Sequence, residues 1–124
     1  MRKTLQLKNA EKLSNALILH SEEKYPLSEL KPAGQLIVDS DAVAFVYLAE
    51  TEEDYVYIYL PESVWGDMKS ALDEQITIKA VSGDEELVLE NIHEELAYLI
   101  ENIEGNSNYG EEMVKKAESV FLSK

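Results

Sequence analysis

Three short runs of β-branched and aromatic residues in the middle of the chain constrain its fold most. They are residues 36–38, 42–49 and 55–60, and the polar stretches 39–41 and 50–54 separate them. Runs of this length and composition are typical of strands, and connections this short join antiparallel neighbours. The sequence therefore predicts three antiparallel strands joined by two hairpins.

Four further segments have the apolar pattern of strands. They are residues 4–7, 16–19, 75–81 and 86–90. In the third segment Ile76, Ile78 and Ala80 alternate with polar residues, as in a strand with one buried face. By contrast, residues 21–34 are polar and contain two prolines and a glycine. This stretch is predicted to be a surface loop with room for one helical turn.

Three amphipathic helices are predicted from apolar residues that recur at helical spacing. The first follows Pro61, which is suited to a helix start, and the second is ended by Gly105. Asn108 and Glu111 form a capping-box pattern ahead of the third. The apolar positions are Val64, Met68, Ala71 and Leu72, then Ile92, Leu96, Leu99 and Ile103, and finally Met113, Ala117, Val120 and Phe121.

The order of these elements predicts the fold class. Strands come first, followed by a helix, two strands and two helices, without the regular alternation of a doubly wound fold. We expect an α+β fold in which a mostly antiparallel sheet of six to seven strands carries three helices on one face. With 124 residues, 45% of them hydrophobic, the chain can fill one core. Residues 1–124 are expected to form a single domain.

The residue types exclude several kinds of chemistry. There is no cysteine, which removes disulfides, thiolate nucleophiles and cysteine-based metal sites. The first residues are interrupted by polar side chains too often for a secretory signal, and no segment approaches the ~18 apolar residues of a membrane-spanning helix. The expected location is the cytoplasm.

The net charge of −14 is unevenly distributed along the chain. Residues 1–34 carry six basic and four acidic groups, whereas residues 35–124 carry five basic and twenty-one acidic groups. This distribution argues against nucleic acid and anionic membranes as partners, because both are bound by clustered basic residues. A basic protein surface is the partner that the charge favours.

The most distinctive local feature is a tyrosine stripe. Tyr55, Tyr57 and Tyr59 share one face of a predicted strand, and Phe45 and Tyr47 are expected on the neighbouring strand. Tyrosine suits protein interfaces because it joins a large apolar ring to a polar tip. The favoured interpretation is nevertheless that the rings lie under the helices with their hydroxyls at the rim. The alternative is an interaction surface made of Tyr55, Tyr57, Tyr59, Glu52, Glu53 and Asp54.

Other motifs do not identify a site. The Asp39-Ser40-Asp41 stretch lacks the later ligands and glycine of a calcium loop. Glu90 and His93 have the spacing of one helical face, but a metal needs more ligands, so His93 is expected to be a surface histidine. The loop at 105–110 leads into two glutamates that would repel phosphate. No catalytic, cofactor-binding or metal-ligating residue is predicted.

Three strings of the sequence resemble a small uncharacterised bacterial family, the YjbL-like proteins. The strings are residues 2–8 (RKTLQLK), 59–62 (YLPE) and 94–106 (EELAYLIENIEGN). The resemblance runs nearly end to end and implies a cytoplasmic bacterial protein without an assigned activity. It supplies no catalytic residue.

The sequence leaves several hypotheses about function open. The leading one is a non-enzymatic, acidic protein-interaction or regulatory domain that docks on a basic partner surface; a sharper version is mimicry of nucleic acid. The alternative is an enzyme or small-ligand-binding protein with a pocket between sheet and helices, near Tyr57, Trp65 and His93. A homodimer is a third hypothesis, because exposed sheet edges and aromatic faces often associate.

Overall fold

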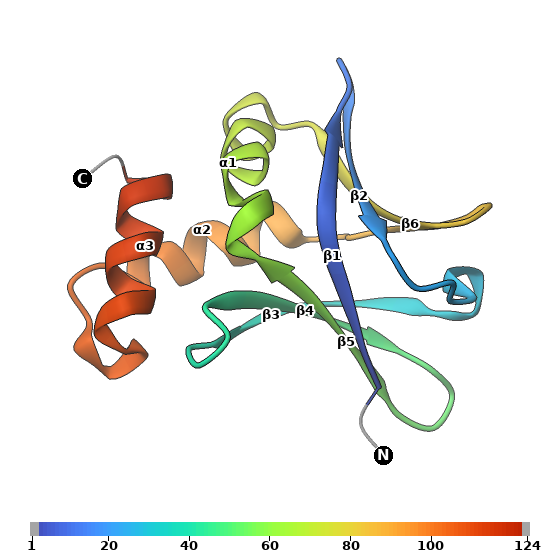
Figure 1. The fold of residues 1–124 in the computed structure, drawn as a ribbon, viewed down its shortest axis with the longest axis horizontal. Coiled ribbons are helices and arrows are strands. Elements are labelled where there is room, and N and C mark those ends of the chain that lie inside the picture. Colours follow the sequence, from blue (N-terminus) through green and yellow to red (C-terminus); the bar gives the residue numbers. More distant parts are fainter. Residues whose placement is uncertain (1–2, 123–124) are drawn as a thin grey trace.

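The computed structural model describes residues 3–122. These residues form one curled seven-stranded sheet with three helices (Figure 1). The strand order is β3-β4-β5-β1-β2-β6-β7. The strands are β1 (Lys3–Lys12), β2 (Ala16–Ser21), β3 (Lys31–Asp39), β4 (Ala44–Glu50), β5 (Tyr55–Pro61), β6 (Thr77–Ser82) and β7 (Glu85–Val88). The predicted α+β class is confirmed.

The strand pairing explains how the N-terminal hairpin enters the sheet. Four of the six neighbouring pairs are antiparallel, whereas β1 runs parallel to β5 and β2 runs parallel to β6. The β1–β2 hairpin therefore lies in the middle of the sheet, between strands that follow it in sequence. Because of this insertion, the starts of β1, β3, β5 and β7 meet the ends of β2, β4 and β6 at one end of the sheet.

The three helices pack on one side of the sheet (Figure 1). They are α1 (Trp65–Glu74), α2 (Ile92–Ile103) and α3 (Glu111–Phe121). Trp65 lies between Phe45 and Phe121, at ring-centroid distances of 5.1 and 5.8 Å. Its indole Nε1 donates a hydrogen bond to the carbonyl of Leu60 at 2.9 Å. This contact satisfies the one polar atom that the buried ring carries.

Helical segments cover the two edges of the sheet. At the β3 edge, Asn91 Nδ2 donates to the Gly34 carbonyl at 3.1 Å, and Glu95 Oε1 accepts from the Leu36 amide at 3.0 Å. At the β7 edge, the Ser28 amide and hydroxyl both donate to Glu85 Oε1, which ties the short 3-10 helix η1 (Leu27–Glu29) to β7. The Asn91 and Glu95 contacts occupy backbone groups of β3 that otherwise invite pairing with another chain.

Two local predictions were wrong. Residues 31–34 belong to β3 and not to a loop, with a register shift between Pro32 and Gln35 where Gly34 has a φ of +68°. The capping box also does not form, because α3 starts after Gly110, whose φ is +91°. The Asn106 side chain accepts from the Asn108 amide instead, within the 3-10 helix η3 (Ser107–Tyr109).

Tyr47 ties β4 to the segment that enters α2. Its side chain is fully buried, and its hydroxyl donates to the Glu90 carbonyl at 2.7 Å. Burial raises the pKa of Tyr47 to about 12. An unfolded chain ionises tyrosine near pH 10, so the stability contributed by the neutral phenol is present below about pH 10 and is lost as the pH rises toward about 12.

We predict that Tyr47→Phe lowers the free energy of unfolding by ~1–2 kcal/mol at pH 8, because the Glu90 carbonyl loses its partner. The deficit relative to wild type should shrink between about pH 10 and 11.5, since only the wild type loses the contribution of this phenol. Urea unfolding at several pH values measures both effects. Tyr98→Phe is the matched control, because Tyr98 is 63% exposed. A deficit that stays constant with pH would contradict the role assigned to Tyr47.

Candidate functional site

The tyrosine stripe lies on the face of the sheet opposite the helices. In the β4–β5 register Tyr55 pairs with Glu50, Tyr57 with Leu48 and Tyr59 with Val46. Val56, Ile58 and Leu60 alternate with these tyrosines and belong to the core that the helices complete. The interpretation that the rings lie under the helices is therefore wrong.

Phe45 and Tyr47 do lie on the neighbouring strand, but on its other face. They pair with Leu60 and Ile58 and belong to the helix-covered core. Because the side-chain period of a strand is two, adjacent positions on β4 point to opposite sides of the sheet. The stripe is thus confined to β5.

The three tyrosines differ in exposure along β5. Tyr55 is 41% exposed, Tyr57 is half-buried and Tyr59 is 7% exposed. The Tyr59 hydroxyl donates to Asp39 Oδ2 at 2.7 Å. Its ring packs in a second apolar cluster to which no helix contributes, made of Ala44, Val46, Leu48 and Tyr59 with Ala33, Ile37 and Tyr57 against it. Of the stripe, Tyr55 and part of Tyr57 are accessible to a partner.

Three connections carry acidic residues to the same end of the sheet, which we call the acidic end. It consists of Lys3 and residues 21–31, 50–55 and 82–86, the segments that link β2 to β3, β4 to β5 and β6 to β7. These residues include ten carboxylates and three lysines, a net charge of −7. Half of the chain's net charge of −14 is therefore gathered at one end.

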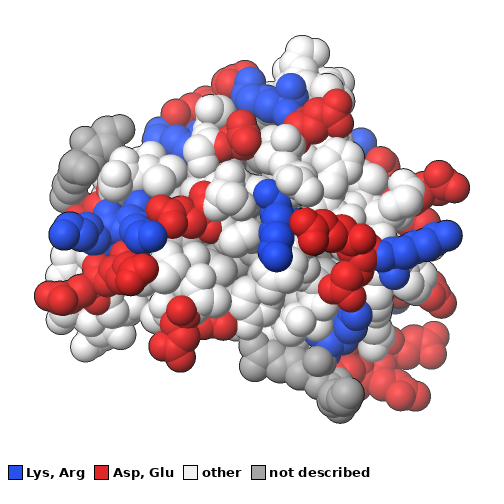
Figure 2. All heavy atoms as spheres, viewed as in Figure 1, with Lys and Arg blue, Asp and Glu red and all other residues white. Residues whose placement is uncertain are grey.

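Figure 2 shows acidic side chains grouped at its lower right, where the β4–β5 connection lies in Figure 1. The predicted residues Glu52, Glu53 and Asp54 are all exposed in this connection, and Tyr55 follows them directly. Sequence reasoning missed the contribution of Glu22, Glu23 and Glu29, because it assigned the N-terminal quarter a mildly basic character. The predicted antiparallel pairing could have revealed this contribution, because it brings alternate connections to the same end of a sheet.

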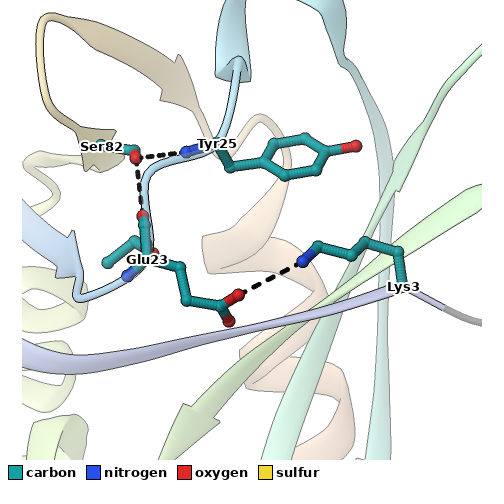
Figure 3. Close-up of polar contacts among 5 residues, drawn as sticks. Lys3, Glu23, Tyr25 and Ser82 are labelled. Atoms are coloured by element: carbon teal, nitrogen blue, oxygen red, sulfur yellow. Dashed lines mark hydrogen bonds and ion pairs between the residues drawn. The ribbon is translucent and has the colours of Figure 1, made fainter.

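Hydrogen bonds fix the backbone of the acidic end. Ser82, which is 2% exposed, accepts from the Tyr25 amide and donates to the Glu23 carbonyl, both at 2.8 Å (Figure 3). In the β4–β5 connection the Thr51 hydroxyl oxygen accepts from the Asp54 amide at 2.9 Å, and the Thr51 amide donates to the Asp54 carbonyl at 2.8 Å. The two connections therefore hold defined positions despite their exposure.

An open cleft of about 540 Å³ lies between these connections. Its lining residues are Tyr25, Glu29, Thr51, Glu52 and Glu53. Next to it, Lys3 Nζ is 5.4 Å from the centroid of the Tyr25 ring and 3.3 Å from Glu23 Oε2. Figure 3 shows Lys3 extending toward the Glu23 carboxylate on the side of the Tyr25 ring. The cleft combines an aromatic ring with carboxylates, a pairing that attracts cations.

The residues suggested for a ligand pocket do not come together. Tyr57 lies on the helix-free face of the sheet, whereas Trp65 is buried in the core on the other face. His93 lies in the first turn of α2, where its Nε2 is 2.6 Å from the Ile76 carbonyl. A carbonyl only accepts, so Nε2 carries the hydrogen. His93 is half-buried, and its buried Nδ1 has no hydrogen-bond partner among residues 3–122, so the predicted surface histidine is exposed only in part.

Among residues 3–122, no three His, Cys, Asp or Glu side chains are grouped to hold a metal ion. Glu90 precedes α2, which begins at Ile92, so Glu90 and His93 do not share a helical face. Within the described part of the chain, no helix is long and apolar enough to cross a membrane.

Comparison with known proteins identifies the family. The profile of UPF0738, described as a family of unknown function, matches residues 5–121. The chain belongs to the UPF0738 family. A UPF0738 protein of Bacillus cereus (strain G9842) is 42% identical over 123 residues, covering 98% of this chain and 100% of the relative. The comparisons support an uncharacterised bacterial family but do not carry the YjbL-like designation.

Two further UPF0738 relatives show the same end-to-end similarity. A Bacillus licheniformis protein is 42% identical over 122 residues, covering 98% of this chain and 100% of the relative. A Geobacillus protein (strain WCH70) is 39% identical over 124 residues, covering 99% and 100%. No solved structure matches the chain.

We predict that Ser82→Ala loosens the acidic end. The Tyr25 amide would lose its acceptor, so we expect a loss of ~1–3 kcal/mol in the free energy of unfolding. The Tyr25 amide should also exchange with solvent at least about tenfold faster, which hydrogen-exchange NMR measures. Ser14→Ala, in the exposed turn between β1 and β2, is the control. Unchanged exchange at Tyr25 would show that Ser82 does not hold this connection.

Proposed function

We propose that this UPF0738 protein is a non-enzymatic, cytoplasmic interaction domain whose acidic end, with Tyr55 beside it, docks on a basic surface of a partner protein. The observation that carries the proposal is the concentration of charge. Three neighbouring connections together with Lys3 hold ten carboxylates and three lysines, which is half of the net charge of the chain. A field of one sign over one end of a small domain attracts an opposite patch.

The physical chemistry of this surface favours a protein partner over a small anionic ligand. Clustered carboxylates repel anions and accelerate encounter with cationic surfaces, and this attraction weakens as salt screens it. Tyr55, 41% exposed, adds an aromatic contact at the border of the charged patch. Aromatic residues supply apolar contact area at interfaces, whereas exposed charges mainly set the rate and specificity of association.

The backbone of the acidic end supports the same function. Ser82 and Thr51 hold the first and second connections, and Ser28 holds Glu85 beside η1. The hydrogen bonds from Ser28 lower the pKa of Glu85, because they stabilise its charged form. Because these groups are already ordered, a partner does not need to order them on binding.

Affinity capture from lysate of a UPF0738-bearing Bacillus tests the proposal. We expect the wild-type chain to retain a protein with a basic surface at low salt and to lose it at raised salt. Glu52→Lys/Glu53→Lys should reduce capture by about tenfold, because the reversed charges repel the same surface. The matched control is Glu94→Lys/Glu101→Lys, which changes the charge equally on α2 and should leave capture nearly intact.

Three outcomes would contradict the proposal. One is that no partner is retained at low salt. Another is that both double variants lose the partner equally, which would mean that net charge alone decides binding. The third is that the retained protein is a second copy of this acidic chain. Light scattering at two concentrations detects that homodimer directly.

A further inference from the structure

The cleft at the acidic end is built from two segments that are distant in sequence. Tyr25 and Glu29 line one side, while Thr51, Glu52 and Glu53 line the other. Both sides are anchored, since Ser82 binds the Tyr25 amide and Thr51 closes the β4–β5 connection. The cleft has a volume of about 540 Å³ and is open to solvent. One long side chain can enter it while the rest of its chain remains outside.

The chemistry of the lining selects a cation. The face of a tyrosine ring attracts an ammonium or guanidinium group within ~6 Å of its centroid. Glutamate carboxylates accept charge-assisted hydrogen bonds from the same groups. Tyr25 provides the ring, and Glu29, Glu52 and Glu53 provide three carboxylates, all of them exposed.

The protein already places one cation against this ring. Lys3 Nζ lies 5.4 Å from the Tyr25 centroid and pairs with Glu23 at 3.3 Å (Figure 3). The Lys3 side chain is 43% exposed and the Glu23 side chain 54% exposed. An ion pair this exposed is weak, so another cation can compete for the ring. The position of Lys3 therefore shows which kind of group this ring accepts.

We propose that the cleft is the specificity site of the docking surface and takes one lysine or arginine side chain of the basic partner against Tyr25, in competition with Lys3. This inference rests on the proposed function, because it names the group that the acidic end recognises. Long-range attraction brings the basic surface to the acidic end, and the cleft then binds one of its side chains. The ring contributes through contact and not through net charge.

The test uses the full chain and a fluorescein-labelled octalysine peptide, with binding followed by fluorescence anisotropy at low ionic strength. Tyr25→Leu should weaken binding by about two- to fivefold, because a cation over an aromatic ring in contact with solvent adds a modest amount to affinity. Tyr25→Phe keeps the ring and should retain most of the affinity. Tyr98→Leu removes an exposed tyrosine from α2 without changing charge, and should bind as wild type does.

A second pair of variants tests the competition with Lys3. Lys3→Met should bind octalysine more tightly than Lys24→Met. Both variants remove one positive charge from the acidic end, so they change its net charge equally. Of these two lysines, Lys3 is the one placed over the Tyr25 ring. Equal effects of the two variants would overturn the competition.

The outcomes separate this inference from the proposed function. If wild type does not bind octalysine at low salt, the acidic end is not a basic-protein dock and both proposals fail. If wild type binds but Tyr25→Leu binds equally well, the cleft proposal alone is overturned. If Tyr25→Phe loses as much affinity as Tyr25→Leu, the ring is not the contact and the cleft proposal is again overturned. Circular dichroism of each variant checks that it is folded.

Discussion

The register of β4 against β5 decides which side of the sheet becomes the core. It places Tyr47 opposite Ile58 and Phe45 opposite Leu60, so that large apolar side chains from both strands face the helices. A shift of β5 by one residue would turn Ile58 and Leu60 outward and bring the tyrosines of β5 inward. Trp65 and Phe121 then complete a packed aromatic group with Phe45. The position of the helices follows from this pairing.

The same pairing has a consequence for charge. Since the chain turns between successive antiparallel strands, every second connection is at the same end of the sheet. One end of the sheet has the β1–β2 turn and the connections that lead into α1 and β6. The opposite end has the β2–β3, β4–β5 and β6–β7 connections, which form the acidic end. Carboxylates held this close repel one another, and the repulsion destabilises the compact state. The hydrogen bonds of Ser82, Thr51 and Ser28 offset part of that cost.

Much of the fold could be predicted from the sequence because local patterns determine it. Alternating apolar residues marked the strands, and helical spacing marked the three helices. The non-local features could not be predicted. Nothing in residues 4–19 indicates that their hairpin lies between β5 and β6, because parallel pairing depends on partners far along the chain. The stripe was assigned to the wrong face because both faces of β5 carry large apolar or aromatic side chains. Which face becomes the core depends on where the helices pack, and that is a non-local feature.

The candidate surface was predicted in part. Glu52, Glu53, Asp54 and Tyr55 are exposed together, as expected for a hairpin connection, while Tyr59 is buried against the second cluster. Tyr25 was not predicted to belong to a site, because it lies in a polar stretch without an apolar periodicity. Its importance depends on Ser82, which lies 57 residues away and fixes its backbone. Counting charge along the chain also assigned Glu22, Glu23 and Glu29 to a mildly basic segment, whereas in the folded protein they lie at the acidic end.

The central claim is that the acidic end, and not the acidity of the whole chain, recognises a basic partner. NMR titration of the labelled full chain with a lysine-rich peptide tests it most directly. The account predicts that amide shifts concentrate in residues 21–31, 50–55 and 82–86 and saturate together. Shifts spread evenly over all acidic segments, or centred on the glutamates of α2 and α3, would contradict it.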